Sequence, residues 1–111
     1  MADLVQVISK PGPCQIKTTA MIESNEPAIV TLAGSVWSTQ PNSMIGISLG
    51  IDGAQAGIAQ IFANAPAMHL AVVPVTFSYT FTIGEHEFEL NALTGETNSD
   101  SNDFYVVTVQ Y

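Results

Sequence analysis

The sequence has almost no positive charge. It contains two lysines, no arginine and ten carboxylates, which together give a formal net charge of −8. A nucleic-acid-binding protein needs lysine and arginine to neutralise a row of phosphates, so this composition argues against nucleic acid as a partner. Attraction to anionic membrane surfaces is disfavoured for the same reason. Charged residues of either sign make up only 11% of the chain, against about 25% in an average soluble domain.

Cysteine, targeting signals and long apolar runs are also scarce. Cys14 is the only cysteine, so no intrachain disulfide can form. It alternates in phase with Ile16, which predicts a buried small residue rather than a nucleophile. The N-terminus lacks the basic start and apolar run of a signal peptide, and no stretch is long enough for a membrane-spanning helix. We therefore expect a soluble protein, cytoplasmic by default, without membrane insertion.

The sequence is dominated by strand-like alternation. Its 111 residues are 47% apolar, which predicts one folded domain over residues 1–111. Short stretches of period two, separated by turn residues, predict strands over residues 4–9, 14–22, 28–38, 44–51, 57–62, 68–81, 85–93 and 104–111. Asp52 and Gly53 predict a hairpin turn, Gly34 a bulge, and Pro74 an edge or corner. This pattern predicts an all-β, antiparallel β-sandwich.

Four segments resemble a known superfamily in their order and spacing. They are the apolar run 29–37, the strand and Asp-Gly turn 45–53, the Gly-Glu segment 79–90, and the polar loop with the last strand, 101–107. Together they resemble the compact jelly roll of the tumour-necrosis-factor type, which includes the globular heads of complement proteins. The resemblance implies a jelly-roll fold and a homotrimer packed through residues of one sheet. The glycine that the family has after its C-terminal phenylalanine is absent, because Tyr105 follows Phe104.

The composition supports self-association independently of this resemblance. A small monomer normally covers itself with charge, and a chain with so few charges has extra apolar surface to bury. We therefore predict a homo-oligomer, with a trimer favoured. The candidate interface anchors are large apolar or aromatic residues: Trp37, Phe62, Met68, Tyr79, Tyr105 and Tyr111. Each of them is equally well explained as an ordinary core residue.

The polar loop before the last strand is the best candidate for a cation site. Its alternating side chains offer carboxylate and amide oxygens, which calcium prefers: Glu96, Asn98, Asp100, Asn102 and Asp103. The loop lacks the central glycine and the late glutamate of the helix-loop-helix calcium site. Such side chains also cap their own backbone in metal-free turns, so a loop without calcium is the alternative.

The two histidines have different settings. His86 is in phase with Phe88 and Leu90, which predicts an inward-facing, hydrogen-bonded side chain. The opposite face of the same strand carries Glu85, Glu87 and Glu89, a pattern typical of a solvated outer face. His69 follows the break at Pro66, where a surface, interface or ligand-binding role remains open.

Two functions fit these observations. The first is a non-enzymatic structural or interaction protein, a small trimeric jelly roll that presents a binding surface. The alternative is a carbohydrate-binding, lectin-like module, with or without calcium, in which Trp37 stacks on a sugar while Asn42 and His69 contact hydroxyls. Tyr105 beside Asp100 and Asn102 is a second arrangement of the same kind. No nucleophile-elbow motif or glycine-rich phosphate loop supports an enzyme.

Overall fold

The fold is that of a computed structural model, which describes residues 3–111 of the chain. Within these residues the chain forms nine strands: β1 (Leu4–Pro11), β2 (Ile16–Ile22), β3 (Pro27–Val36), β4 (Ser43–Ile51), β5 (Ala54–Ala63), β6 (Leu70–Ala71), β7 (Val75–Thr80), β8 (Gly84–Ala92) and β9 (Phe104–Gln110). Each predicted strand is present. The long predicted segment 68–81 is divided into β6 and β7, and residues 72–74, which include Pro74, separate the two. No helix in this part of the chain is long and apolar enough to span a membrane.

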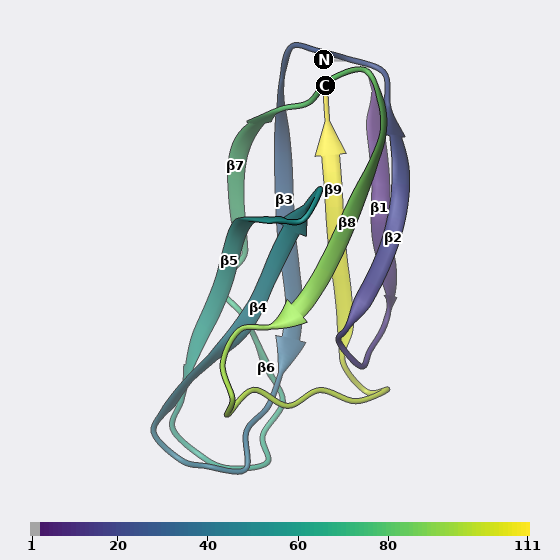
Figure 1. Ribbon diagram of the computed structural model, residues 1–111. Coiled ribbons are helices and arrows are strands. Elements are labelled where there is room, and N and C mark those ends of the chain that lie inside the picture. Colours follow the sequence, from purple (N-terminus) through teal and green to yellow (C-terminus); the bar gives the residue numbers. More distant parts are fainter. Residues whose placement is uncertain (1–2) are drawn as a thin grey trace.

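The strands form two antiparallel sheets packed face to face, as Figure 1 shows. One sheet has the order β1-β9-β3, and the far edge of β3 pairs with β7 and, further along, with β6. The other sheet has the order β2-β8-β4-β5. When β6 and β7 count as one interrupted strand, every connection crosses from one sheet to the other except the β4–β5 hairpin, which is the jelly-roll order. The predicted all-β sandwich with jelly-roll topology is therefore confirmed.

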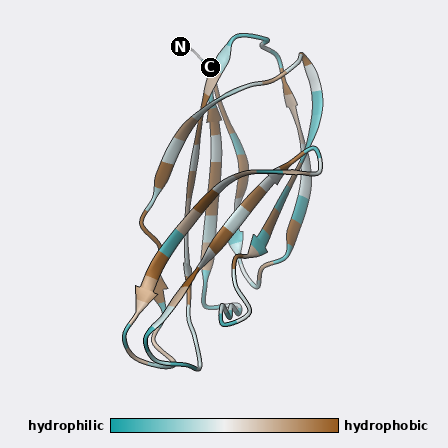
Figure 2. Cartoon of the chain, turned by 60° about the vertical axis from the view of Figure 1, so that its left-hand side comes forward, coloured by the Kyte–Doolittle hydropathy of each residue, from teal (hydrophilic) through white to brown (hydrophobic). Residues whose placement is uncertain are grey.

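The core lies between the sheets because alternate residues of every long strand point inward. Figure 2 shows the resulting change between hydrophobic and hydrophilic positions along the strands. The largest fully buried side chains are Tyr105 and Phe88, surrounded by isoleucine, leucine and valine. This packing follows from the period-two alternation that the sequence displays.

Two of the predicted local features have different outcomes. The hairpin between β4 and β5 turns at Asp52 and Gly53, whose φ angles are 53° and 87°, as the Asp-Gly signal predicted. The predicted bulge at Gly34 is wrong, since β3 and β9 stay in register through the pair Gly34 and Tyr105. A Cβ atom at Gly34 would lie 2.4 Å from the Tyr105 ring, so glycine is present there to admit that ring.

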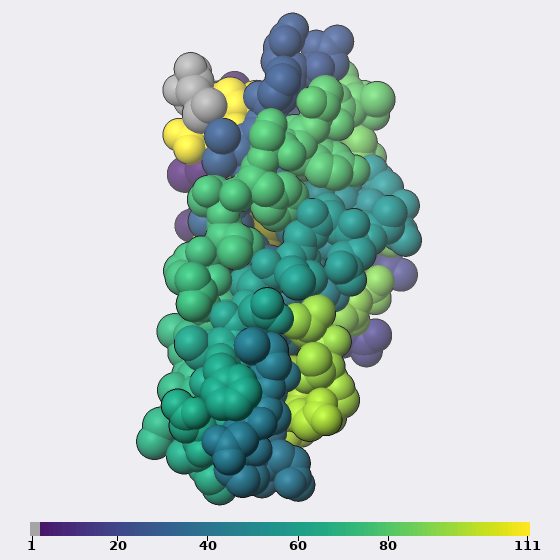
Figure 3. Space-filling view, turned by 90° about the vertical axis from the view of Figure 1, so that its left-hand side faces the viewer, coloured from purple at the N-terminus to yellow at the C-terminus, as the bar shows by residue number. Residues whose placement is uncertain are grey.

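The two ends and the two side edges of the sandwich differ. The termini lie at one end, and loops 37–42, 64–69 and 93–103 lie at the other (Figure 1). Figure 3 shows the side edge formed by β5 and β7. At this edge the ring of Phe77 packs against Gly57. At the opposite side edge, β1 and β2 leave a hollow between the sheets.

Candidate functional site

Backbone hydrogen bonds hold the three loops together at the end of the sandwich away from the termini. Trp37 and Asn98 exchange two of them, with N to O distances of 3.0 and 2.7 Å. The amide of Ala67 donates to the carbonyl of Ser38 at 2.6 Å. Loop 37–42 is thus attached to both of the other loops, which gives side chains from distant parts of the sequence fixed positions.

Asp103 is the centre of a side-chain network between these loops. It is 1% exposed, and its carboxylate accepts hydrogen bonds from the Ser35 hydroxyl at 2.7 Å and from the Asp100 amide at 2.9 Å. Its third partner is Nδ1 of His69, also at 2.7 Å. A buried carboxylate is stable only when such donors replace water, so this set of contacts explains how Asp103 is tolerated.

His69 connects Asp103 to the surface. Its Nδ1 faces an acceptor and carries a proton in both charge states, while its Nε2 lies 3.8 Å from Oδ2 of Asp100. The hydrogen bond to Asp103 raises the pKa of His69 above its usual range, with a further contribution from the charge of Asp100. The Trp37 ring lies next to the imidazole, with centroids 5.7 Å apart and planes tilted by 38°.

The cation site predicted from the polar loop is only partly assembled. One ligand atom each from His69, Asp100 and Asp103 lies within 4.8 Å of the others. Glu96 is outside this group, Asn98 bonds Trp37 through its backbone, and the Asn102 amide donates to Oδ1 of Asp100 at 2.8 Å.

The donor set of this cluster differs from the predicted set of oxygens. Calcium takes about six to eight oxygen ligands, and this cluster offers two carboxylates, of which Asp103 is already engaged by three donors. An imidazole beside carboxylates also suits zinc or manganese. The sequence could not show that His69 takes part, because 34 residues separate it from Asp103.

The predicted interface anchors lie in different environments. Tyr105 is fully buried within its own sandwich, so the prediction that it contacts another copy or a sugar is wrong. Tyr79 and Tyr111 pack against the core, and the Tyr111 hydroxyl accepts a hydrogen bond from the Glu23 amide. Phe62 and Met68 are 46% and 54% exposed and remain predictions.

The remaining predicted ligand contacts lie at the loop end. Trp37 is partly exposed, although its indole nitrogen is buried and has no acceptor among residues 3–111. Asn42 is exposed in the turn before β4, with a φ of 53°, and no hydrogen bond joins it to the network around Asp103. The structure therefore brings Trp37 and His69 together, and Asn42 stands apart from their contact.

Cys14 lies at this same end, just before β2. Its amide donates to the Ser99 hydroxyl at 2.9 Å, and its side chain packs against the core. Burial raises the pKa of the Cys14 thiol, which keeps it protonated and unreactive at neutral pH.

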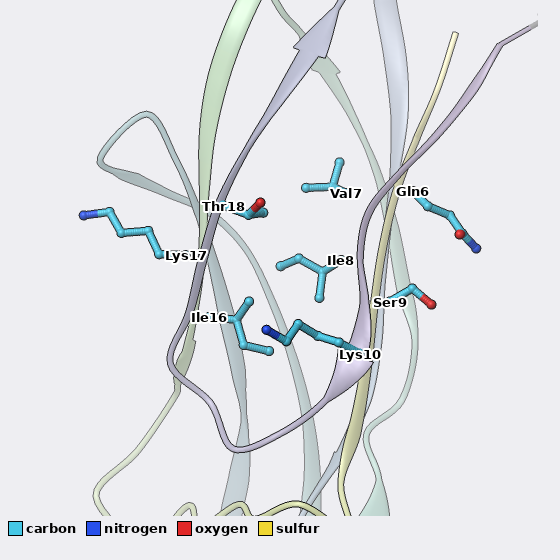
Figure 4. Close-up of a pocket in the computed structure, with 8 residues that line it drawn as sticks. All are labelled: Gln6, Val7, Ile8, Ser9, Lys10, Ile16, Lys17 and Thr18. Atoms are coloured by element: carbon cyan, nitrogen blue, oxygen red, sulfur yellow. The ribbon is translucent and has the colours of Figure 1, made fainter.

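The hollow between β1 and β2 is a second concave region, of about 400 Å³. Figure 4 shows Lys10 pointing across it toward Ile16, whereas Lys17 points away. Lys17 lies 3.8 Å from Glu87 on the neighbouring strand. The lining residues, 6–10 and 16–18, include no aromatic side chain on which a sugar ring could stack.

The buried His86 forms a separate pair with the exposed carboxylate of Asp52, and its burial confirms that it faces inward. Its Nδ1 lies 2.5 Å from Oδ2 of Asp52, and its Nε2 lies 2.7 Å from the carbonyl of Thr82. Because both ring nitrogens face acceptors, the imidazolium form satisfies both contacts. Burial alone would lower the pKa of His86, but these two hydrogen bonds outweigh it and raise the pKa. The same contact lowers the pKa of Asp52.

This pair predicts a pH-dependent stability. A raised pKa in the folded state means that the His86 contribution is complete below about pH 6.5 and is lost as the pH rises through the folded-state pKa. The Asp52 contribution is present above about pH 4 and is lost below it. We expect the free energy of unfolding, measured with urea, to fall as the pH rises above about 6.5, and to fall less in His86→Gln. An equal fall in both proteins would contradict this assignment.

Comparison with known proteins identifies similar folds. No protein-family model matches the sequence, and no curated protein does either. The EclA C-terminal domain, described as a sugar-binding protein, has a TM-score of 0.52 and 15% identity over 97% of this chain and 77% of that one. The CBM36-1 domain of a multidomain xylanase from the hindgut metagenome of Trinervitermes trinervoides has a TM-score of 0.52 and 15% identity over 98% and 96%.

A third similar structure, dimeric latent PorU from Porphyromonas gingivalis, has a TM-score of 0.56 and 7% identity. This chain covers only 11% of PorU, although 95% of this chain is aligned. At such identities the likeness establishes the fold alone. The jelly-roll part of the predicted resemblance is confirmed, whereas the similar structures are sugar-binding and other domains and give no support to the tumour-necrosis-factor superfamily or its trimer.

Proposed function

We propose that this chain is a non-catalytic carbohydrate-binding module whose site is the loop end formed by Trp37, His69 and Asp100. The observation that carries the proposal is the meeting of a partly exposed tryptophan, an imidazole and a carboxylate across loops far apart in sequence. An aromatic ring can stack on the apolar face of a sugar, and polar groups placed beside it read the hydroxyls.

The fold supports this proposal over the trimeric interaction protein. Two of the similar structures are described as a sugar-binding protein and as a CBM36-1 domain of a xylanase, and the second matches over nearly the whole of both chains. Jelly rolls carry many different functions, so the fold alone does not establish that this chain binds sugars. The side chains at the loop end supply the specific argument.

The charge of the chain narrows the class of sugar. A net charge of −8 and the carboxylates of Asp100 and Asp103 repel uronates and sulfated sugars. The carboxylate of Asp100 can accept hydrogen bonds from neutral hydroxyls. We therefore expect neutral glycans to bind and acidic glycans to fail.

Replacing Trp37 tests the proposed site. We expect Trp37→Ala to weaken binding to the best neutral glycan on an array by about 30-fold, the loss typical of a tryptophan hot spot. Phe62→Ala, which removes an exposed aromatic residue from β5, is the matched control and should bind as the wild type does. Circular dichroism checks that both variants are folded. A folded wild type that binds no glycan on a broad array overturns the proposal.

The charge balance at His69 predicts how cations affect binding. The imidazolium of His69 offsets the carboxylates of Asp100 and Asp103 at low pH, and a divalent cation can replace the proton once His69 is neutral. We expect glycan binding at about pH 6 to survive EDTA, and binding at about pH 8.5 to be lost in EDTA and restored by zinc. Isothermal titration calorimetry at the two pH values measures this, and equal sensitivity to EDTA at both would contradict it.

A further inference from the structure

Among residues 3–111, the outward positions that β1, β9, β3 and β7 place in paired rows carry no charged side chain. The strand registers place its outward residues in rows, from Pro27 and Thr80 at one end to Pro11 and Phe104 at the other. Between them lie Leu4, Gln110, Ile29 and Ser78; then Gln6, Thr108, Thr31 and Thr76; then Ser9, Val106 and Ala33. We call these residues the neutral face. All of them are exposed or partly exposed.

The small number of charged residues in the chain does not by itself explain the neutral face, because the outer face of the opposite sheet is charged. Its outer face carries Glu85, Glu87 and Glu89 on β8, together with Lys17 on β2. Outward positions are where charge normally accumulates, because a charged group is costly to bury. Asp103 reaches this side of the sheet only beyond the last row, where its 1% exposed carboxylate accepts the Ser35 hydroxyl, and the rows themselves carry none of the ten carboxylates.

We propose that the neutral face packs against the same face of a second copy of this chain, forming a two-fold dimer. Two molecules of net charge −8 repel one another, and the neutral face allows contact without bringing their carboxylates together. Beyond about 8 Å, physiological salt screens the remaining repulsion. The exposed side chains of Leu4 and Ile29, 62% and 38% accessible, supply apolar area, and the threonines, serines and glutamines supply hydrogen-bonding groups.

The size of the neutral face fits a weak but specific contact. Four strands spaced by about 4.8 Å and a length of about eight residues give a rectangle of roughly 19 by 26 Å. Two such faces bury about 1,000 Å² in projection, and more when the pleated surface is counted, which reaches the lower bound for specific interfaces. We therefore expect a dimer at protein concentrations on the order of 100 µM.

Sedimentation equilibrium of the full chain tests the proposal with a matched pair of variants. Thr31→Lys places a charge at the centre of the neutral face, whereas Thr19→Lys places the same charge on the outer face of the other sheet, opposite Glu87. Both variants lower the net negative charge equally. We expect the wild type and Thr19→Lys to dimerise, Thr31→Lys to associate at least about tenfold more weakly, and higher salt to strengthen the wild-type dimer.

Several results would overturn the dimer. They are a wild type that is monomeric at these concentrations, or a folded Thr31→Lys that dimerises as the wild type does. If Thr31→Lys fails to fold, Thr76→Lys on β7 at the exposed edge of the same row replaces it and carries the same expectation. A monomeric wild type whose glycan binding is lost on Thr31→Lys would assign this face to a sugar instead, which also overturns the proposal.

Discussion

Asp103→Ala should destabilise the protein by about 3–5 kcal/mol, the cost expected when one partner of a buried charged network is removed. The substitution leaves the Ser35 hydroxyl, the Asp100 amide and Nδ1 of His69 without the 1% exposed carboxylate that accepts from all three. Each buried donor that loses its partner costs about 1–3 kcal/mol. Urea denaturation followed by tryptophan fluorescence measures the change, because Trp37 lies next to this network.

Two further variants separate the charge of Asp103 from its position. Asp103→Asn keeps the shape and one acceptor oxygen, so we expect a smaller loss of stability and a His69 pKa closer to its ordinary value. Asp100→Ala removes a partly exposed carboxylate and should change stability little while weakening glycan binding. Equal stability losses in Asp103→Ala and Asp100→Ala would contradict the central role of Asp103.

The sheets could be predicted from the sequence because their signals are local. Period-two alternation over residues 44–51 matches β4, and the Asp-Gly pair marks the turn into β5, since both residues tolerate a positive φ. The inward direction of His86 follows from the same alternation. These features depend on neighbours in sequence, which a single chain displays directly.

The candidate site could be predicted only in pieces. Asp100, Asp103, Trp37 and His69 were each identifiable as chemically capable residues. Their meeting depends on how three loops cross the end of the sandwich, and 68 residues separate Ser35 from Asp103. The wrong prediction for Tyr105 has the same origin. The alternation along a strand shows which residues share a face, but it does not show whether that face packs against the chain's own core or against another molecule.

The proposed dimer and the proposed sugar site use different parts of the molecule. The neutral face covers the outside of one sheet, and Trp37, His69 and Asp100 lie in the loops at one end. A back-to-back pair of sandwiches would present two sugar sites at once. Two linked sites bind a repeating polymer more tightly than one, with no new contact to the sugar. Retention on an immobilised polysaccharide should therefore fall when the dimer is broken, while affinity for a short oligosaccharide is unchanged.

Gly34→Ala should cost about 3 kcal/mol or more, at the upper end of what overpacking a core normally costs. Its new Cβ would lie 2.4 Å from Cδ1 of Tyr105, closer than van der Waals contact allows. The ring has no space to move away, because Tyr105 is fully buried and its other edge lies 3.0 Å from the position of a Cβ atom on Gly12. The midpoint of thermal unfolding measures this loss. Because the substitution adds only a methyl group and changes no charge, the fall in the midpoint reports the steric cost.

A double-mutant cycle shows whether the Tyr105 ring is the cause. In a Tyr105→Leu background the smaller side chain leaves room for the methyl group, so Gly34→Ala should there cost about 1 kcal/mol or less. Gly95→Ala adds the same methyl group in a loop where nothing lies within 4 Å, and should leave the midpoint of unfolding nearly unchanged. A Gly34→Ala penalty that persists in the leucine background would mean that the backbone of β9, and not the tyrosine ring, requires glycine at this position.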